Sequence, residues 1–304
     1  MKKLSDIRLA MTILARDEAD IIEDNIRFHA SAGVDKFVVT DNASLDGTRE
    51  ILEKLSKEFD VKIFDEPSHT IDQDRWVSRM ADWLKENNAC DWIINNDADE
   101  FWLTDSDNLR TGVLEALRSS ANDTGVLICS RQNMIASKET TARQDYIFYQ
   151  NNFAVLKNMI PDCGGTEWSV KSGNIVIRKL PGKVITRVEG LKSIGMGNHG
   201  ASHLGSRAEC SNIEIFHYPI RSYEQFQKKV VNYGSSLEKN ERFSLNISSH
   251  LRHWYECHKD GILREQYDLF VLPEQELVDL QKKNILKNDS RILECFVNQR
   301  GIAA

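Results

Sequence analysis

Three acidic side chains follow an apolar run within four positions of the sequence. The stretch IINNDADEFW, residues 93–102, contains Asp97, Asp99 and Glu100. Carboxylates at this spacing repel one another, and the end of an apolar strand solvates them poorly. We therefore expect a cation beside them. A solvated acidic loop after a strand is the alternative.

Two further polar clusters follow apolar runs nearer the N-terminus. The segment RDE, residues 16–18, follows one run, and DNASLDGT, residues 41–48, follows the next. Helix capping by Ser44 or Asp46 would explain part of the second cluster without any ligand. Capping leaves the first two residues of that segment, an aspartate and an asparagine, unexplained.

The apolar pattern predicts the elements that position these clusters. Strands are expected at residues 7–14, 36–40, 61–64 and 91–95, with helices between them at residues 19–32, from about residue 48, and at 70–87. This alternation predicts an α/β fold with a mostly parallel central sheet and helices on both faces. Ligands of such sheets bind at the carboxyl ends of the strands, where all three clusters fall.

The pattern is weaker beyond residue 102. Strands are expected at residues 124–129 and 173–178, and the end of the chain reads as helical. We expect a nucleotide-sugar-binding half over residues 1–102 and an acceptor-binding half of the same catalytic domain over 103–245. A helical C-terminal extension follows over 246–304.

The composition of the 304 residues describes a soluble globular protein with a sizeable core. The formal net charge of −7 lacks the basic excess that binds nucleic acid. Six cysteines are scattered without a CxxC pair, which favours reduced thiols in the cytoplasm. No segment has the apolar length of a membrane span. Peripheral contact with the inner face of a membrane stays open.

Three segments taken together resemble a known family. ILARDEAD, GVDKFVVTDNASLDGT and NNDADEFW come in the order found in glycosyltransferase family 2-like proteins of the glycosyltransferase A fold. FHYPIRSYEQFQKKV, residues 216–230, resembles a later segment of the same set, and the match fades between about residues 135 and 208. The resemblance implies a metal-dependent enzyme that transfers a hexose, with inversion, from a UDP-linked nucleoside-diphosphate sugar to a saccharide or lipid-linked acceptor.

The resemblance also implies which residues bind the donor. The nucleotide-sugar pocket is expected to contain Arg16, Glu18, Asp41, Asn42, Arg75 and Asp97. Asp41 would hydrogen-bond the nucleobase or ribose, and Arg75 would lie against the base or a phosphate. The alternative for Arg75 is an exposed helical arginine paired with Asp72 or Asp74.

A metal site follows from the same resemblance. Asp97 and Asp99 would supply oxygen ligands to Mn²⁺ or Mg²⁺ from a solvent-facing strand end, and the metal would neutralise the diphosphate leaving group. His217, after the strand IEIF, would complete the shell, in preference to His199 or His203. A structural histidine is the alternative for His217.

Inversion at the anomeric carbon needs a carboxylate base near the acceptor hydroxyl. Glu167 in GGTEWSV is the first candidate, because glycines and an aromatic residue flank it, and Asp162 is the rival. A surface acid in a loop is the alternative for both. His250, His253 and Cys257 share a helical face and lack a fourth zinc ligand, so packing is the favoured role.

Two other functions stay open. A sugar nucleotidyltransferase would share an α/β nucleotide domain, but it would usually carry a glycine-rich basic loop where this chain has the acidic ARDEAD. A non-catalytic nucleotide-sugar-binding protein would have no need of the metal acids. Release of nucleoside diphosphate rather than pyrophosphate from a donor distinguishes the transferase.

Overall fold

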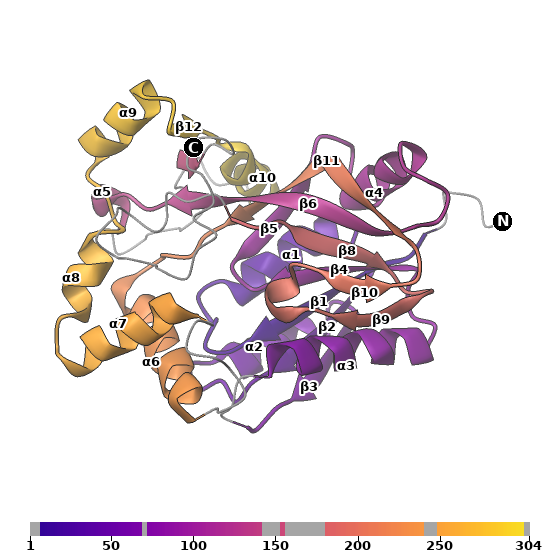
Figure 1. Ribbon diagram of the computed structural model, residues 1–304, viewed down its shortest axis with the longest axis horizontal. Helices are drawn as coiled ribbons and strands as arrows, with labels where there is room; N and C mark the ends of the chain where they lie inside the picture. The colour runs from indigo at the N-terminus through magenta and orange to yellow at the C-terminus, as the bar shows by residue number, and fades with distance from the viewer. Residues whose placement is uncertain (1–6, 69–71, 142–152, 156–179, 240–247, 301–304) are drawn as a thin grey trace. The chain divides into compact units, whose positions relative to one another are not determined.

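The computed structural model describes residues 7–68, 72–141, 153–155, 180–239 and 248–300 (Figure 1). The chain divides into two compact units, the first of residues 1–131 with 181–215 and the second of residues 132–180 with 216–304. The two units are defined by how compactly their residues are packed, and not by function. The donor and acceptor halves expected on either side of residue 102, and the extension from residue 246, stay a prediction.

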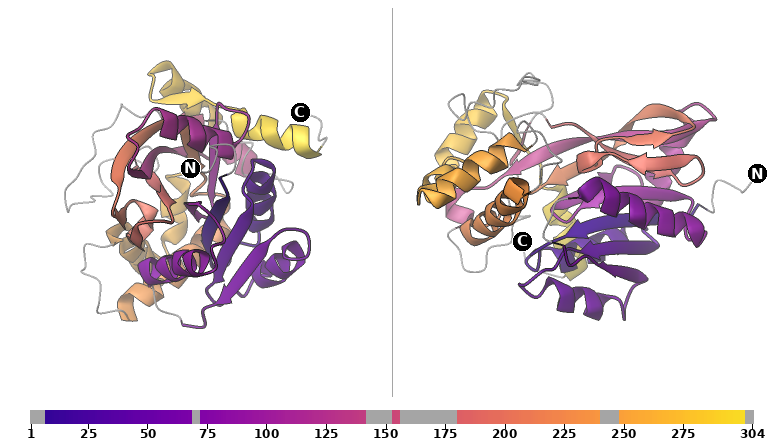
Figure 2. Two further views of the ribbon diagram at one scale, coloured as in Figure 1. Left: turned by 90° about the vertical axis from the view of Figure 1, so that its right-hand side faces the viewer. Right: turned by 60° about the horizontal axis from the view of Figure 1, so that its bottom comes forward.

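Four parallel strands form the centre of the first unit. They are β1 (Leu9–Ala15), β2 (Lys36–Asp41), β3 (Val61–Asp65) and β4 (Trp92–Asp97). Their order in the sheet is β3-β2-β1-β4 (Figure 2). The central strands read as nearly continuous apolar runs because helices cover both faces of the sheet. The mostly parallel α/β fold is confirmed, with strand ends within about two residues of those expected.

The connecting helices are α1 (Ile22–Ser31), α2 (Thr48–Leu55) and α3 (Gln73–Glu86). The first two crossovers move outward from β1, and the third returns from β3 to the far side of β1. Right-handed crossovers therefore place α3 on the opposite face from α1 and α2, and α3 lies in front of the strands in Figure 1. Both faces of the parallel sheet are thereby covered.

The later strands of the first unit extend the sheet with antiparallel pairs. β8 (Lys183–Arg187) lies between β4 and β6 (Thr124–Ile135) and is antiparallel to both. β5 (Glu100–Thr104) pairs with β11 (Ser206–His217), which also pairs with β6. The remaining elements are α4 (Leu109–Arg118), β9 (Leu191–Ile194), the 3₁₀ turn η5 (Met196–Asn198) and β10 (Ala201–His203).

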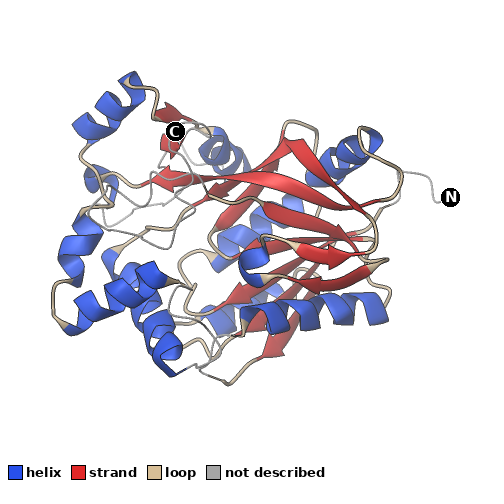
Figure 3. Cartoon of the chain, in the orientation of Figure 1, coloured by secondary structure: helices blue, strands red, loops and turns tan. Residues whose placement is uncertain are grey.

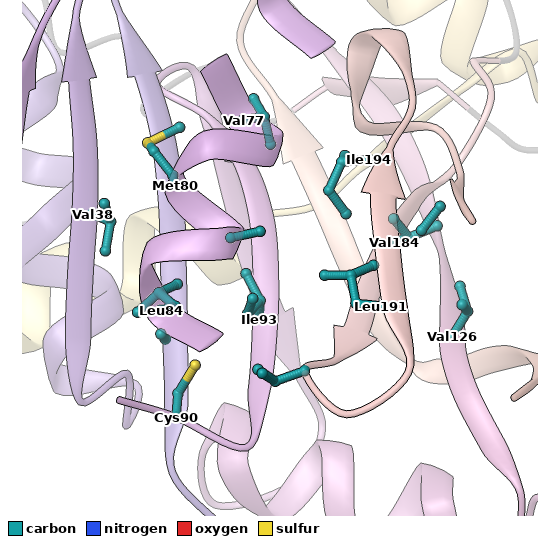
Figure 4. Close-up of a cluster of buried hydrophobic side chains, with 14 residues drawn as sticks. Val38, Val77, Met80, Leu84, Cys90, Ile93, Val126, Val184, Leu191 and Ile194 are labelled. Carbon is teal, nitrogen blue, oxygen red and sulfur yellow. The ribbon is translucent and has the colours of Figure 1, made fainter. Parts of the chain in front are cut away.

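A hydrophobic core joins the parallel and antiparallel parts of this unit (Figure 4). Met80 and Leu84 of α3 pack over Val38 of β2 and Ile93 of β4, and Val184 of β8 belongs to the same cluster. All five are buried. At roughly 25 cal/mol per Å² of apolar surface removed from water, each side chain of this size contributes about 1.5–3 kcal/mol to stability. This cluster fixes β8 beside β4.

The second unit is mainly helical (Figure 3). Its helices are α5 (Lys138–Thr141), α6 (Tyr223–Lys239), α7 (Ser249–Lys259), α8 (Leu263–Asp268), α9 (Glu274–Lys282) and α10 (Arg291–Arg300). The end of β6 pairs with β7 (Phe153–Val155), which pairs with β12 (Leu286–Asn288). The helical end of the chain is as expected, apart from this short strand. None of the described helices is both long and apolar enough to cross a bilayer.

One histidine of α7, His250, has a packing role in this unit. His250 lies edge-on against Trp254, with ring centroids 5.2 Å apart, and Trp254 packs against Phe226 and Phe270. Burial lowers the pKa of His250 to about 4. The described residues contain no group of three His, Cys, Asp or Glu side chains placed to hold a metal ion. This arrangement agrees with the packing role favoured by the sequence.

Candidate functional site

The ends of three parallel strands bring the polar clusters together. In the strand register, Asp41 of β2 pairs with Ala15 of β1, and Asp97 of β4 pairs with Leu14. The two aspartates therefore lie on either side of the last two residues of β1. Asp65 ends β3 next to Asp41. The sequence expectation that these clusters share one edge of the sheet is met.

The loops after β1 and β2 are joined by reciprocal hydrogen bonds. The Asp17 carboxylate accepts from Leu45 N at 2.7 Å, and Asp17 N donates to Ser44 Oγ at 3.0 Å. Glu18 N donates to Thr48 Oγ1 at 2.9 Å. Asp17 has a φ of 56°, a left-handed conformation that the surrounding bonds must hold. The two loops form one preorganised structure.

Asp41 and Asn42 have structural partners within this pair of loops. Asp41 is 6% exposed and its Oδ1 accepts from Ser44 N at 3.2 Å, which closes a turn. Asn42 donates through Nδ2 to the carbonyl oxygens of Glu66 and Ser68, at 3.1 and 2.6 Å, and accepts from Arg16 at 3.3 Å. Turn formation therefore explains one oxygen of Asp41, and contacts to the segment after β3 and to Arg16 explain Asn42.

Arg75 lies in the first turn of α3. Its side chain is 68% exposed and its Nη1 is 3.7 Å from Asp72 Oδ2, the geometry of an exposed helical ion pair. Such a pair contributes little to stability. Arg75 also lines an open pocket with Phe64, Arg79 and Trp83. A role for Arg75 at the nucleotide stays a prediction.

The cation beside the acidic turn is a lysine. The Lys183 side chain is fully buried, and its Nζ is 2.8 Å from Glu100 Oε2 and also hydrogen-bonded to Asp97 Oδ2. The second oxygen of Glu100 accepts from Arg131 Nη1 at 2.8 Å. A cation was predicted here from the sequence, but neither basic residue was, because Arg131 and Lys183 lie 31 and 86 positions away from their acidic partners.

Asp97 contacts three protein donors in this arrangement. Its Oδ1 accepts from Asn198 Nδ2 at 3.1 Å and, more weakly, from Gln73 Nε2 at 3.5 Å, while Oδ2 faces Lys183. The Asp97 side chain is 29% exposed. Asp99, expected at a solvent-facing strand end, is instead 3% exposed, because the turn between β4 and β5 folds it inward. That part of the expectation was wrong.

These side chains, as placed, do not fit a divalent cation. Mn²⁺ and Mg²⁺ take several oxygen ligands, and within the described ranges no three His, Cys, Asp or Glu side chains gather to supply them. His217 lies in the second unit, where its Nδ1 is 2.7 Å from Asn133 Oδ1. Ligation of a metal by Asp97, Asp99 and His217 stays a prediction.

His199 belongs to the same unit as the acidic turn. The 3₁₀ turn η5 places Asn198 against Asp97, and the neighbouring His199 has its Nδ1 2.9 Å from Gly182 O. The pKa of this imidazole is lowered, mainly because the surrounding protein removes water from it and also because the positive charges of Arg131 and Lys183 lie nearby. In the sequence His199 lies in the glycine-rich segment GMGNHG, and His217 was preferred to it as a metal ligand.

A buried polar network supports the acidic turn from behind. Asn25 of α1 donates through Nδ2 to Ala98 O and Glu100 O. His29 Nε2 accepts from Trp102 N at 3.0 Å, so the proton lies on Nδ1, which donates to Asn25 O at 2.8 Å. Burial lowers the pKa of His29 to about 3, so the ring is neutral at physiological pH. The network fixes the turn to α1.

Glu167 and Asp162, the two candidates for the catalytic base, lie outside the described residues. The expected strand at residues 173–178 lies outside them as well. Of the predicted site, the structure therefore describes the donor side, where Arg16, Glu18, Asp41 and Asp97 come from adjacent strand ends or the loops after them.

Comparison with known proteins identifies a family. The model of glycosyltransferase family 92 matches residues 9–252, most of the chain. A search of curated proteins finds no match. The resemblance to family 2-like proteins placed the chain among glycosyltransferases, and the family 92 match supports that coarser assignment.

Among solved structures, TarS 1–349 of S. aureus in complex with UDP is 12% identical, with 85% of this chain and 70% of that chain covered and a TM-score of 0.41. The same protein in complex with UDP-GlcNAc is 13% identical, with 85% of this chain and 71% of that chain covered and a TM-score of 0.40. Glucosyl-3-phosphoglycerate synthase from Mycobacterium tuberculosis, in complex with Mn²⁺, UDP and glucosyl-3-phosphoglycerate, is 13% identical over 42% and 45%, with a TM-score of 0.29. These values are too low to transfer a ligand to this chain.

Proposed function

The chain belongs to glycosyltransferase family 92, and we propose that it transfers a hexose from a UDP-linked nucleoside-diphosphate sugar to a hydroxyl of a saccharide or lipid-linked acceptor. The observation that carries the donor side of this proposal is the placement of Asp41 and Asp97 on either side of the last residues of β1. Parallel α/β sheets bind their ligands at this edge.

Asp41 is the proposed contact to the nucleoside. Its Oδ1 closes the turn with Ser44, and within the described part of the chain no donor reaches its Oδ2. A buried carboxylate oxygen of this kind can accept a hydrogen bond from a ribose hydroxyl or from a base N–H. The interlocked loops hold it in place before the donor binds, which reduces the entropy lost on binding.

The transfer step is proposed to invert the anomeric carbon. A carboxylate, Glu167 or else Asp162, removes the acceptor proton as the hydroxyl oxygen attacks, and the nucleoside diphosphate leaves with the electron pair of the broken bond. Arg16 and Arg75 are proposed to face the donor as positive charges. Mn²⁺ or Mg²⁺ remains a prediction from the sequence, and no step is assigned to it because the described side chains do not form its site.

A donor screen tests this function. The full chain is incubated with individual UDP-linked and other nucleotide sugars, with and without Mn²⁺, and the released nucleotide is measured. Release of nucleoside diphosphate from at least one donor supports the transferase. Pyrophosphate release would support the sugar nucleotidyltransferase instead, and binding without turnover would support a non-catalytic nucleotide-sugar-binding protein.

A further inference from the structure

We propose that Lys183 is a built-in counter-cation of the acidic turn, and that a divalent cation reaches the Asp97 carboxylate only by displacing the Lys183 ammonium. The inference rests on the proposed donor site and deepens it. It starts from the two contacts of Nζ, one to Asp97 and one at 2.8 Å to Glu100, in a side chain with no solvent exposure.

The fold is built to bring this lysine to the turn. A buried ammonium is strongly disfavoured unless acidic partners compensate it, so its burial between two carboxylates is a specific arrangement. Gly182, immediately before it, passes so close to β6 that a Cβ there would collide with the carbonyl oxygen of Cys129. The glycine therefore lets the start of β8 approach β6, and the next residue enters the acidic turn.

The two carboxylates that contact Lys183 already face two cations without a metal. Asp97 and Glu100 contribute two negative charges, and Lys183 and Arg131 contribute two positive charges. A divalent cation bound to Asp97 would lie within a few ångströms of the ammonium, where like charges repel strongly in a low dielectric. The lysine and the metal therefore compete for one carboxylate.

Lys183 acts through Asp97 and is a positioning residue. It holds the carboxylate at the end of β4 while Asn198 and Gln73 hold the other oxygen. The arrangement accounts for an acidic turn that is stable without a metal. It also predicts that the lysine lowers the affinity of the Asp97 carboxylate for a metal.

Binding of Mn²⁺ alone to the full chain tests this inference, measured by calorimetry and by the loss of free Mn²⁺ signal in electron paramagnetic resonance. Lys183→Met is expected to tighten Mn²⁺ binding by about tenfold or more, because it removes a positive charge in contact with the site. Lys183→Arg keeps the charge and is expected to stay near the wild-type affinity. Lys192→Met, an exposed lysine on β9, is the matched control.

Two further variants make the result unambiguous. If Lys183→Met does not fold, Lys183→Met with Glu100→Gln removes one charge of each sign and takes its place. Adding Asp97→Asn to either variant should abolish the gain in affinity. Equal or weaker Mn²⁺ binding in a folded variant without the lysine, or no Mn²⁺ binding to wild type and variant alike, would overturn the inference.

Failure of this inference is distinct from failure of the proposed function. The Mn²⁺ measurement requires no turnover, so competition between lysine and metal can be confirmed even if no nucleotide sugar is used. Conversely, a chain that releases nucleoside diphosphate but shows no effect of Lys183→Met on Mn²⁺ affinity keeps its function and loses this role for Lys183.

Discussion

Asn25 holds the backbone on both sides of Asp99. Its side-chain amide donates to Ala98 O at 2.9 Å and to Glu100 O at 2.8 Å, while its own Oδ1 accepts from Asn96 at 3.2 Å. One fully buried side chain of α1 thus sets the conformation of the turn that carries the acidic motif. An uncharged side chain of a helix thus helps to position the acids.

The first prediction concerns this amide. Asn25→Ala leaves two buried carbonyl oxygens without their donor, so the free energy of unfolding should fall by about 2 kcal/mol or more. Donor affinity should fall as well, because the acidic turn loses its support. Urea unfolding and nucleotide titration measure the two effects. Ser31→Ala, at an exposed position of the same helix, should change neither, and a wild-type donor affinity in a folded Asn25→Ala chain would contradict the positioning role.

The second prediction is a pH dependence of stability. Burial lowers the pKa of His29 to about 3, whereas an unfolded histidine titrates near its model value of 6.5. The stability from the neutral ring is complete above pH 6.5 and is lost as pH falls toward 3, because the unfolded chain binds a proton that the folded chain does not. The slope from this group approaches about 1.4 kcal/mol per pH unit.

His29→Gln should flatten this part of the stability curve. Unfolding free energies between pH 4 and pH 7 are compared for wild type, His29→Gln and His253→Gln, the last as a control for losing an exposed imidazole. His250, whose pKa burial lowers to about 4, adds a similar dependence that both variants retain. Parallel curves for wild type and His29→Gln would exclude His29 as a source of the acid sensitivity.

The third prediction separates binding from turn formation at Asp41. Asp41→Ala should weaken UDP binding by about 1–3 kcal/mol, the cost of losing a hydrogen bond to a charged group. The same change removes the hydrogen bond from Ser44 N, which can lower the stability of the fold. UDP affinity by calorimetry and the free energy of unfolding are therefore both measured for each variant. Asp65→Ala changes the same residue type at the next strand end and serves as control. Unchanged UDP affinity would leave Asp41 as a turn residue.

The fourth prediction concerns the base. Glu167→Gln keeps the shape of the side chain but cannot accept a proton, so the chemical step should slow by about 10²–10⁴-fold with donor binding unchanged. The rise of rate with pH should also be lost. If Glu167→Gln is active and Asp162→Asn is not, the base is Asp162, and activity in both variants would remove the base from this segment.

The sequence predicted the parallel sheet well because its strands β1, β2 and β4 are buried on both faces. β1 and β2 are continuous apolar runs, and the polar residues that follow them mark the strand ends without any knowledge of tertiary contacts. Asp41 and Asp97 could be placed at one edge on this basis alone. Loop contacts such as that of Asp17 with Leu45 could not, because they depend on the left-handed backbone at Asp17.

The buried partners of the acidic turn could not be predicted from the sequence, for a different reason. Lysine is ordinarily exposed, so nothing in PGKVITR indicates that Lys183 is buried. His29 lies at helical spacing from Ile22 and Ile26, which indicates its burial but not its hydrogen bonds to Trp102 and Asn25. Pairings across such separations arise from the packing of the whole unit, and a local pattern does not encode them.

β8 enters the sheet between β4 and β6, although both neighbours precede it in the chain. During synthesis, residues 1–131 are therefore made before the strand that fills the space between them. Until residue 183 is translated, the facing edges of β4 and β6 have open hydrogen-bonding groups, which are prone to pair with other chains. Glu100 meanwhile lacks the Lys183 ammonium. Such long-range closure is slow, so we expect the nascent first half to be prone to aggregation until its acidic turn is completed.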